Sequence, residues 1–307
     1  MRKRRLMSLA ALGAVGALAL AGCASDGAGG TTEFGGGGSS SGGGDKGTIT
    51  LGFLPSWTDG LSTAYLLQDQ LEKLGYTVEM QTLTEAGPLY TGLAQGDVDI
   101  FPSAWPEVTH AEYMKTYGDS IEDLGAYYDN AKLTIAVPEY SELTSIEDLV
   151  GKGAEFDGKI YGIEPGAGLT AQTQKALPAY GLDGEYELIT SSTAAMLTEL
   201  GAATDKNEDI VVTLWRPFWA NAAFPVKDLE DPKGAMGETE ALHFLGTKGF
   251  AEEFPDAAEL IEQIKLDDDQ YGSLEDLVVN EYGEGREAEA VDAWLEEHGS
   301  DFDWVVD

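Results

Sequence analysis

The chain has 307 residues, enough for two ordinary domains, with 55 acidic and 18 basic residues and a formal net charge of −37. Such a charge argues against binding of nucleic acid, because that binding depends on neutralising phosphates with lysine and arginine. It also argues against adsorption of the protein surface to anionic lipid. Cys23 is the single cysteine of the chain, so an intramolecular disulfide is excluded.

Residues 1–22 have the pattern of a bacterial lipoprotein signal peptide. Four basic residues, 2–5, precede an apolar stretch from Leu6 to Leu20 that is short for a transmembrane span. The following Ala21-Gly22-Cys23 completes a sequence that resembles a lipobox. We therefore expect cleavage before Cys23, lipid attachment to its sulfur, and a protein anchored to the cell membrane on its extracytoplasmic face.

The segment that follows the signal peptide is predicted to be a tether. Residues 24–46 are almost all Gly, Ser, Ala and Thr. Such a composition buries no apolar surface and behaves as a flexible linker. We assign 23–46 to the lipidated cysteine and this linker, so the folded part is expected to begin at residue 47.

From residue 47 onward, predicted strands alternate with predicted helices. Apolar and β-branched runs predict strands at 48–54, 76–83, 97–101, 132–137, 159–163, 186–189, 209–214 and 241–245. Helical spacing and capping residues predict helices at about 58–74, 88–95, 106–118, 145–150, 169–180, 193–203, 251–264, 274–282 and 287–297. This alternation predicts an α/β fold with a parallel or mixed sheet, built from two blocks, 47–133 and 134–239, and a helical C-terminal segment.

Four features directly follow predicted strands. They are Trp57, Trp105, the Gly166–Gly168 loop and Trp215. In open α/β sheets, ligands bind beyond the carboxyl ends of the strands. The shared position of these four features predicts a ligand site.

The residue types in this set suit a small zwitterion. An indole face attracts a cation without a counter-charge, at about 0.5–2 kcal/mol for each face. His110, five residues after Trp105, can hydrogen-bond an anion. The glycine-rich turn before Leu169 opens a helix whose first N–H groups can bind a carboxylate. For Trp219, Trp294 and Trp304, ordinary packing is the simpler interpretation.

Three segments carry a resemblance to a known family. They are Ser103-Ala104-Trp105-Pro106 with His110, the run 161–168 (YGIEPGAG), and the run 211–219 (VVTLWRPFW). With them, the chain resembles the lipid-anchored substrate-binding proteins of glycine betaine/proline betaine ABC importers over about residues 47–300. The resemblance implies a two-lobed, type II periplasmic-binding-protein-like fold that closes on its ligand. Lobe I would be 47–133 plus 240–307, and lobe II would be 134–239.

The resemblance also implies roles for individual residues. Trp57, Trp105 and Trp215 would box a trimethylammonium group, while His110 and the backbone amides of Gly168 and Leu169 would hold a carboxylate. Some family members carry a cage tryptophan where this chain has Ala167, so Trp57 must supply that wall. No buried carboxylate is required opposite the ammonium. The implied mechanism is capture of the solute and delivery to a membrane permease, without catalysis, cofactor or metal.

Other function classes fit the sequence less well. A metal-binding lipoprotein would have to use His110, His243 and His298 without cysteine, and the run from Asp267 departs from a calcium loop at Tyr271 and Val278. A secreted hydrolase would need a nucleophile–base pair that the sequence does not supply. Within the binding class, a choline or carnitine receptor of the same fold remains the alternative, although choline would leave His110 and the loop amides without a carboxylate to bind.

Overall fold

The computed structural model describes residues 46–306. The predicted signal peptide, Cys23 and nearly all of the predicted linker lie outside the described residues. Across residues 46–306, no helix combines the length and the apolar character needed to cross a membrane.

The described residues form strands and helices in alternation, as the sequence predicts. The strands are β1 (Thr48–Phe53), β2 (Thr77–Thr82), β3 (Ile100–Ala104), β4 (Ile121–Pro138), β5 (Lys159–Tyr161), β6 (Glu187–Ile189), β7 (Val212–Arg216), β8 (Val226–Asp228) and β9 (Glu240–Thr247). The α-helices are α1 (Thr58–Lys73), α2 (Ala86–Gln95), α3 (Ala111–Tyr117), α4 (Gly168–Tyr180), α5 (Thr193–Lys206), α6 (Ala220–Ala223), α7 (Phe250–Glu253), α8 (Pro255–Gln263), α9 (Asp268–Asp276) and α10 (Glu287–His298). The shorter elements are the 3₁₀ turns η1 (Gly118–Ser120), η2 (Ile146–Leu149), η3 (Gly153–Phe156) and η5 (Gly299–Asp301), and the π-helical η4 (Leu277–Tyr282).

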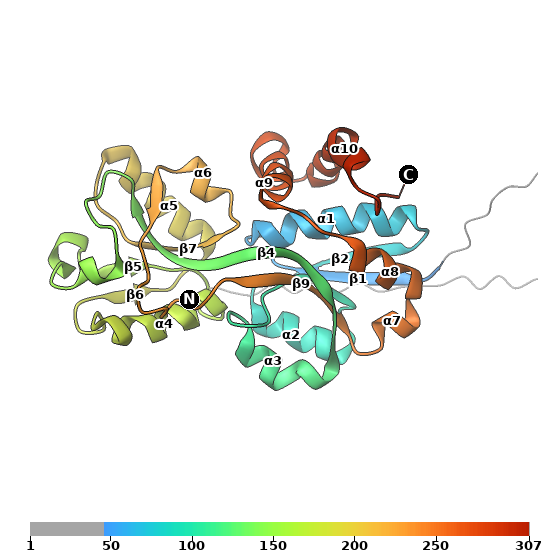
Figure 1. Cartoon of the computed structure of the whole chain (residues 1–307), viewed down its shortest axis with the longest axis horizontal. Coiled ribbons are helices and arrows are strands. Elements are labelled where there is room, and N and C mark those ends of the chain that lie inside the picture. The colour runs from blue at the N-terminus through green and yellow to red at the C-terminus, as the bar shows by residue number, and fades with distance from the viewer. Residues whose placement is uncertain (1–45, 307) are drawn as a thin grey trace, which may run out of the picture. The chain divides into compact units, whose positions relative to one another are not determined.

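The strands form a mixed sheet in the order β2-β1-β3-β9-β4-β7-β5-β6, with β8 beside β4. Strand β4 joins its two halves, because residues 121–131 pair with β9 and residues 132–136 pair with β7. We call β2, β1, β3, β9 and residues 121–131 the first half-sheet. The second half-sheet is the rest of β4 with β7, β8, β5 and β6. Figure 1 shows β4 running from one half to the other.

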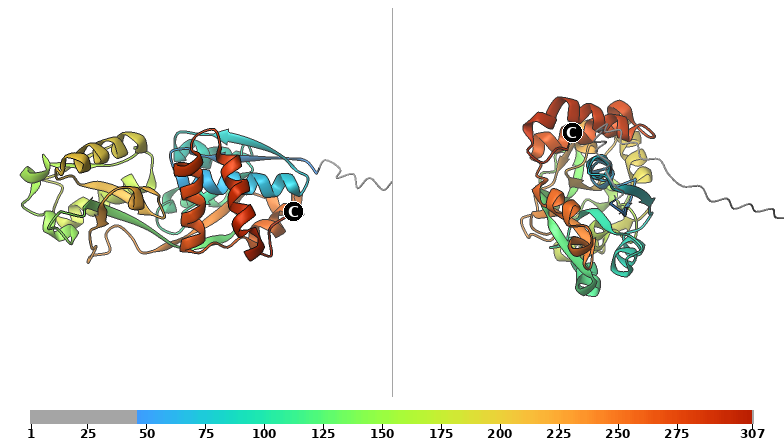
Figure 2. Two further views of the ribbon diagram at one scale, coloured as in Figure 1. Left: turned by 90° about the horizontal axis from the view of Figure 1, so that it is seen from above. Right: turned by 90° about the vertical axis from the view of Figure 1, so that its right-hand side faces the viewer.

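Helices cover both faces of each half-sheet. On the first, α1 packs with α9 and α10 on one face, and α2 and α3 lie on the other (Figure 1). The two views of Figure 2 place α9 and α10 over the same face as α1. On the second, α4 and α5 lie on opposite faces (Figure 1). The apolar side chains between these layers form the core, which includes Trp294 and Trp304, so packing is confirmed for these two indoles.

Local sequence explains where several helices begin and end. Gly96 and Gly181 end α2 and α4 in the left-handed conformation, which glycine adopts without steric cost. Ser192 begins α5 with its hydroxyl accepting from the Ala195 N–H. Asp267 begins α9 through a capping box with Gln270, so the acidic run 267–269 serves as the start of a helix.

The structure corrects three sequence expectations. Strand β4 has 18 residues and starts at Ile121, whereas only 132–137 was predicted as a strand. The helix expected from Pro106 begins at Ala111, and residues 105–110 form a turn. Trp215 lies inside β7 rather than beyond its end. The first two differences arise from contacts with Glu240 and β9, more than 100 residues away in the chain.

Candidate functional site

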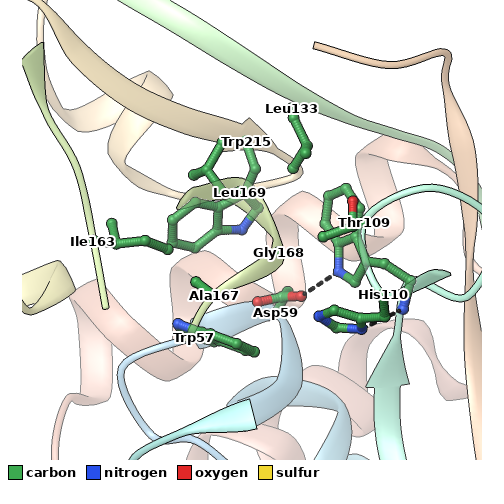
Figure 3. Close-up of a pocket in the computed structure, with 11 residues that line it drawn as sticks. Trp57, Asp59, Thr109, His110, Leu133, Ile163, Ala167, Gly168, Leu169 and Trp215 are labelled. Carbon is green, nitrogen blue, oxygen red and sulfur yellow. Dashed lines mark hydrogen bonds between the residues drawn. The ribbon is translucent and has the colours of Figure 1, made fainter. Parts of the chain in front are cut away.

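A small cavity lies where the two half-sheets meet their connecting loops. Its volume is about 30 Å³, more than the roughly 10–15 Å³ that one water requires. Figure 3 shows Trp57, Asp59 and His110 facing Trp215 and Leu169 across this space. The lining residues are Trp57, Asp59, Trp105, Thr109, His110, Leu133, Ile163, Ala167, Gly168, Leu169 and Trp215. The six residues predicted to bind ligand, which were Trp57, Trp105, His110, Gly168, Leu169 and Trp215, all belong to this set.

The turn from Trp105 to His110 is held by a distant carboxylate. Glu240, the first residue of β9, accepts hydrogen bonds from the backbone N–H groups of Val108 and Thr109, both at 2.9 Å, and from the Thr109 hydroxyl. The Glu240 side chain thereby satisfies the Val108 and Thr109 N–H groups, and the Trp105 carbonyl accepts the His110 N–H at 2.8 Å, so residues 105–110 form a turn and α3 starts at Ala111. Burial raises the pKa of Glu240, and the hydrogen bonds from Thr109 and Val108 oppose that rise.

His110 is a neutral hydrogen-bond donor in this turn. Its Nδ1 accepts the backbone N–H of Trp105 at 3.1 Å, so the proton of the neutral ring is on Nε2. Burial lowers the pKa of His110 to about 3, and aromatic rings surround it, with Tyr90 at 5.3 Å and Phe101 at 6.0 Å between ring centroids. Within the described residues, no protein group accepts a hydrogen bond from Nε2–H of His110. The imidazole ring borders the cavity. His110 can therefore donate to an anion at physiological pH without carrying charge itself.

Asp59 is a buried carboxylate in the same cavity, and the sequence analysis did not include it. It lies in the first turn of α1 and is only 3% exposed. Its Oδ2 accepts the Ser103 hydroxyl at 2.8 Å and the Trp105 indole N–H at 3.3 Å. Burial raises the pKa of Asp59 and these two donors counteract the rise. An acidic group thus stands beside Trp105 in the cavity, and whether the cation requires it stays open to the binding experiments below.

Trp57 forms a hydrogen bond with a residue that follows β5 of the second half-sheet. It precedes α1, is half-buried, and its ring stacks on that of His110 with 6.1 Å between centroids and 20° between planes. Its indole N–H donates to Oε2 of Glu164 at 3.3 Å. Glu164 follows β5 and is 7% exposed, so the carboxylate is buried beside the cavity.

The glycine-rich turn contributes backbone rather than side chains. Gly168 is the first residue of α4, so its N–H and that of Leu169 have no acceptor within the helix. A Cβ on Gly168 would lie 2.2 Å from the Thr109 carbonyl oxygen, so only glycine allows the two sides of the cavity to touch here. A second contact is made by the Tyr113 hydroxyl, which donates to the Gly166 carbonyl at 2.8 Å.

Trp215 forms the wall opposite Asp59. Strand β7 places it beside Leu133 of β4, its paired residue, and both line the cavity. Phe218 stacks on Trp215 with 3.9 Å between ring centroids and 15° between planes. Trp215 is 4% exposed, so the packing of Phe218 holds the indole in one orientation.

Three buried acids, Asp59, Glu164 and Glu240, were missed by the sequence reasoning. Asp59 is two residues after Trp57 and was covered only by the helix predicted at 58–74, while Glu164 was noted only as part of the YGIEPGAG run. For both, the nearness of a proposed cage residue or loop was an available signal. Glu240 gives no local signal, because its partners are more than 130 positions away.

Comparisons with known proteins agree with this geometry. The family model described as "Substrate binding domain of ABC-type glycine betaine transport system" matches residues 47–297. The glycine betaine/carnitine transport binding protein GbuC of Listeria monocytogenes is 40% identical over 111 residues, which span 36% of this chain and 37% of the Listeria protein.

Two solved structures are also similar over most of the chain. Lactococcal OpuAC, in its closed-liganded conformation with glycine betaine, has a TM-score of 0.77 and 30% identity, covering 84% of this chain and 99% of that one. A choline-binding protein of an ABC transporter, in complex with choline, has a TM-score of 0.76 and 25% identity, covering 84% and 91%. The fold is thus the two-lobed, type II periplasmic-binding-protein-like fold expected, with the cavity between the lobes. Because the family model matches most of its length, the chain belongs to the family of substrate-binding domains of ABC-type glycine betaine transport systems.

Proposed function

We propose that this protein is the extracytoplasmic receptor of an ABC importer, and that it binds glycine betaine or a related quaternary-ammonium osmoprotectant. One observation carries the proposal. Three indoles from separate segments, Trp57, Trp105 and Trp215, line a single small cavity together with His110 and the first turn of α4. This combination provides apolar faces for a diffuse cation and N–H donors for a carboxylate.

The cation would be held by the indole faces and by the field of Asp59. A trimethylammonium group cannot donate hydrogen bonds, so aromatic faces are its preferred partners, at about 0.5–2 kcal/mol each. Asp59 lies beside Trp105 and already accepts two hydrogen bonds, so in its ionised form it would add negative charge without requiring a hydrogen from the ligand. The surrounding burial strengthens each of these interactions by lowering the local dielectric.

The carboxylate would accept hydrogen bonds from three N–H groups. These are Nε2–H of His110 and the backbone N–H groups of Gly168 and Leu169 at the start of α4. Hydrogen bonds to an ionised acceptor are short and strong, and the helix dipole favours negative charge at this end. After the cost of immobilising the ligand, the combined contacts are consistent with an affinity on the order of micromolar.

We further propose that ligand binding closes the two lobes. Lobe I would comprise 47–133 and 240–307, and lobe II would comprise 134–239, with β4 and the segment before β9 connecting them. The Tyr113–Gly166 hydrogen bond and the contact of Gly168 with Thr109 join the two sides. A ligand that touches both lobes stabilises the closed form by its differential affinity, and the closed form would deliver it to the permease.

Neither catalysis nor a cofactor forms part of this proposal. Localisation follows from the sequence pattern around Cys23, which supports a lipid anchor on the extracytoplasmic side of the cell membrane.

A choline or carnitine receptor is the second candidate, and Asp59 is the observation that favours it. Choline has a hydroxyl in place of the carboxylate, and a buried carboxylate in the cavity can accept a hydrogen bond from that hydroxyl. The Nε2–H of His110 and the amides of α4 would then have no anionic partner, which makes betaine the better match.

Titration of intrinsic tryptophan fluorescence tests the proposal. The soluble part, from about Asp45, is titrated with glycine betaine, proline betaine, choline and carnitine. We expect a saturable change with the betaines at micromolar concentration and a much weaker response to choline. A response to choline alone would retain the cage and reject the role of His110, and no response to any of the four would reject the function.

A further inference from the structure

Two of the three cage indoles are each held by a buried carboxylate through the indole N–H. Trp105 donates to Asp59 and Trp57 donates to Glu164, both at 3.3 Å. The two pairs differ in where their partners reside. Trp105 and Asp59 both belong to proposed lobe I, whereas Trp57 belongs to lobe I and Glu164 to lobe II. The first pair therefore survives separation of the lobes, and the second pair requires their contact.

Glu164 is anchored within its own lobe independently of Trp57. Its Oε1 accepts the backbone N–H of Thr193 at 3.0 Å, and its Oε2 accepts the Thr193 hydroxyl at 2.9 Å. Thr193 is the first residue of α5, so the carboxylate also lies at the positive end of a 14-residue helix. With these bonds in place, the carboxylate is already oriented toward lobe I before the Trp57 indole reaches it.

The backbone of Glu164 shapes the neighbouring turn. Its carbonyl accepts the N–H of Ala167 at 3.0 Å and the hydroxyl of Thr170 at 2.9 Å. These bonds set up the turn that leads into α4. They involve only the main chain of Glu164, so a change of its side chain to glutamine separates the side-chain role from the shaping of the turn.

We infer that Glu164 is a positioning residue that fixes the Trp57 indole only when the lobes are closed, so that this wall of the cage forms on closure. Trp105, held by Asp59, is in place in both the open and the closed form. The inference rests on the proposed function, since it concerns how the same cage is assembled. Its consequence is that Glu164 slows ligand release, because the Trp57 wall must come apart before the ligand can leave.

A double-mutant cycle measured by calorimetry with glycine betaine tests the inference. Glu164→Gln keeps the shape of the side chain but replaces one acceptor oxygen by a donor. Trp57→Phe keeps an aromatic face but removes the N–H. We expect Glu164→Gln to weaken binding about tenfold, mainly through a faster dissociation rate, and to have almost no further effect in the Trp57→Phe background.

Ser192→Ala is the matched control, because it removes the side-chain cap of the same helix α5 without touching the carboxylate. It should lower the melting temperature and leave the affinity unchanged. The inference would be overturned if the fold-losses of affinity in the two single variants multiplied in the double variant. It would also be overturned if Glu164→Gln bound glycine betaine as tightly as the unmodified protein. Failure of the unmodified protein to bind any of the four ligands would instead overturn the proposed function, and this inference with it.

NMR of the indole N–H groups provides a test on the unmodified protein, which decides the question even if Glu164→Gln does not fold. The signals of Trp57 and Trp105 are assigned with Trp57→Phe and Trp105→Phe. We expect hydrogen exchange of the Trp57 indole to slow at least tenfold on addition of glycine betaine, while the Trp105 indole is protected with and without ligand. The inference would be overturned if the hydrogen-exchange rates of the Trp57 and Trp105 indole N–H groups responded to glycine betaine in the same way.

Discussion

The two sides of the cavity recognise a ligand by different means. The proposed lobe I supplies side chains, namely Trp57, Asp59, Trp105 and His110, and buried hydrogen bonds within this lobe orient Asp59, Trp105 and His110. The proposed lobe II supplies Trp215 and the aliphatic Ile163 and Leu169, and where α4 begins it supplies backbone, with the small residues Ala167 and Gly168. Recognition by the first lobe thus depends on the chemistry of its side chains. Recognition by the second lobe depends on the absence of a side chain at Gly168, where the two lobes touch.

The largest expected effect comes from adding a side chain on the backbone side. Gly168→Ala places a Cβ 2.2 Å from the Thr109 carbonyl oxygen, so the lobes cannot close fully. We expect affinity for glycine betaine and for choline to fall by about 100-fold, as measured by calorimetry. Gly184→Ala is the matched control in the same lobe, because its new Cβ would meet nothing within 4 Å. Equal affinities for the two variants would show that closure does not require the Gly168–Thr109 contact.

A smaller and ligand-specific effect is expected on the side-chain side. His110→Ala removes the neutral Nε2–H donor, so affinity for glycine betaine should fall at least about tenfold while any choline binding hardly changes. Trp105→Ala serves as the comparison, because both ligands present the same cation to that indole and both should bind more weakly. Similar losses of betaine and choline affinity in His110→Ala would contradict the carboxylate assignment.

The smallest expected effect concerns a buried acid outside the cavity. Glu275 of α9 is 3% exposed, and its carboxylate accepts the Thr58 hydroxyl. Burial raises the pKa of Glu275 to about 8, the hydrogen bond from Thr58 opposes this, and the charge of Asp59 adds to it. A pKa that is higher in the folded state means that the protonated form is favoured on folding. The contribution of Glu275 to the free energy of unfolding is therefore fully present below about pH 4, and it is lost as the pH rises through about 8.

Thermal unfolding between pH 5 and 9 measures this contribution. We expect the melting temperature to fall with rising pH, and Glu275→Gln to reduce that fall by several degrees, because glutamine cannot ionise. Glu281→Gln, a change at an exposed acid on the following η4, is the control and should leave the slope as it is. Parallel slopes for the unmodified protein and Glu275→Gln would show that Glu275 does not titrate in this range.

The sequence alone predicted the alternation of strands and helices, and six residues that the structure brings to one cavity. The alternation depends on local information, such as β-branched runs and glycine at helix ends, whereas the ligand roles of the six residues came from the resemblance to a family and stay a prediction. The proximity of Trp57 and Trp105 could be anticipated because β1 and β3 are parallel neighbours whose carboxyl ends lie at the same edge of the sheet, whereas Trp215 lies inside β7 of the other half-sheet.

Only the tertiary structure decided which acids are buried and how the connecting elements run. Asp59, Glu164 and Glu240 look like surface residues in the sequence, and each becomes a buried acceptor through donors 29 or more positions away. Residues 121–131 of β4 are mixed in polarity and become a strand by pairing with β9. The physical reason is the same in both cases. The free energy of burying a carboxylate or pairing an irregular strand depends on its distant partners, and local sequence does not specify them.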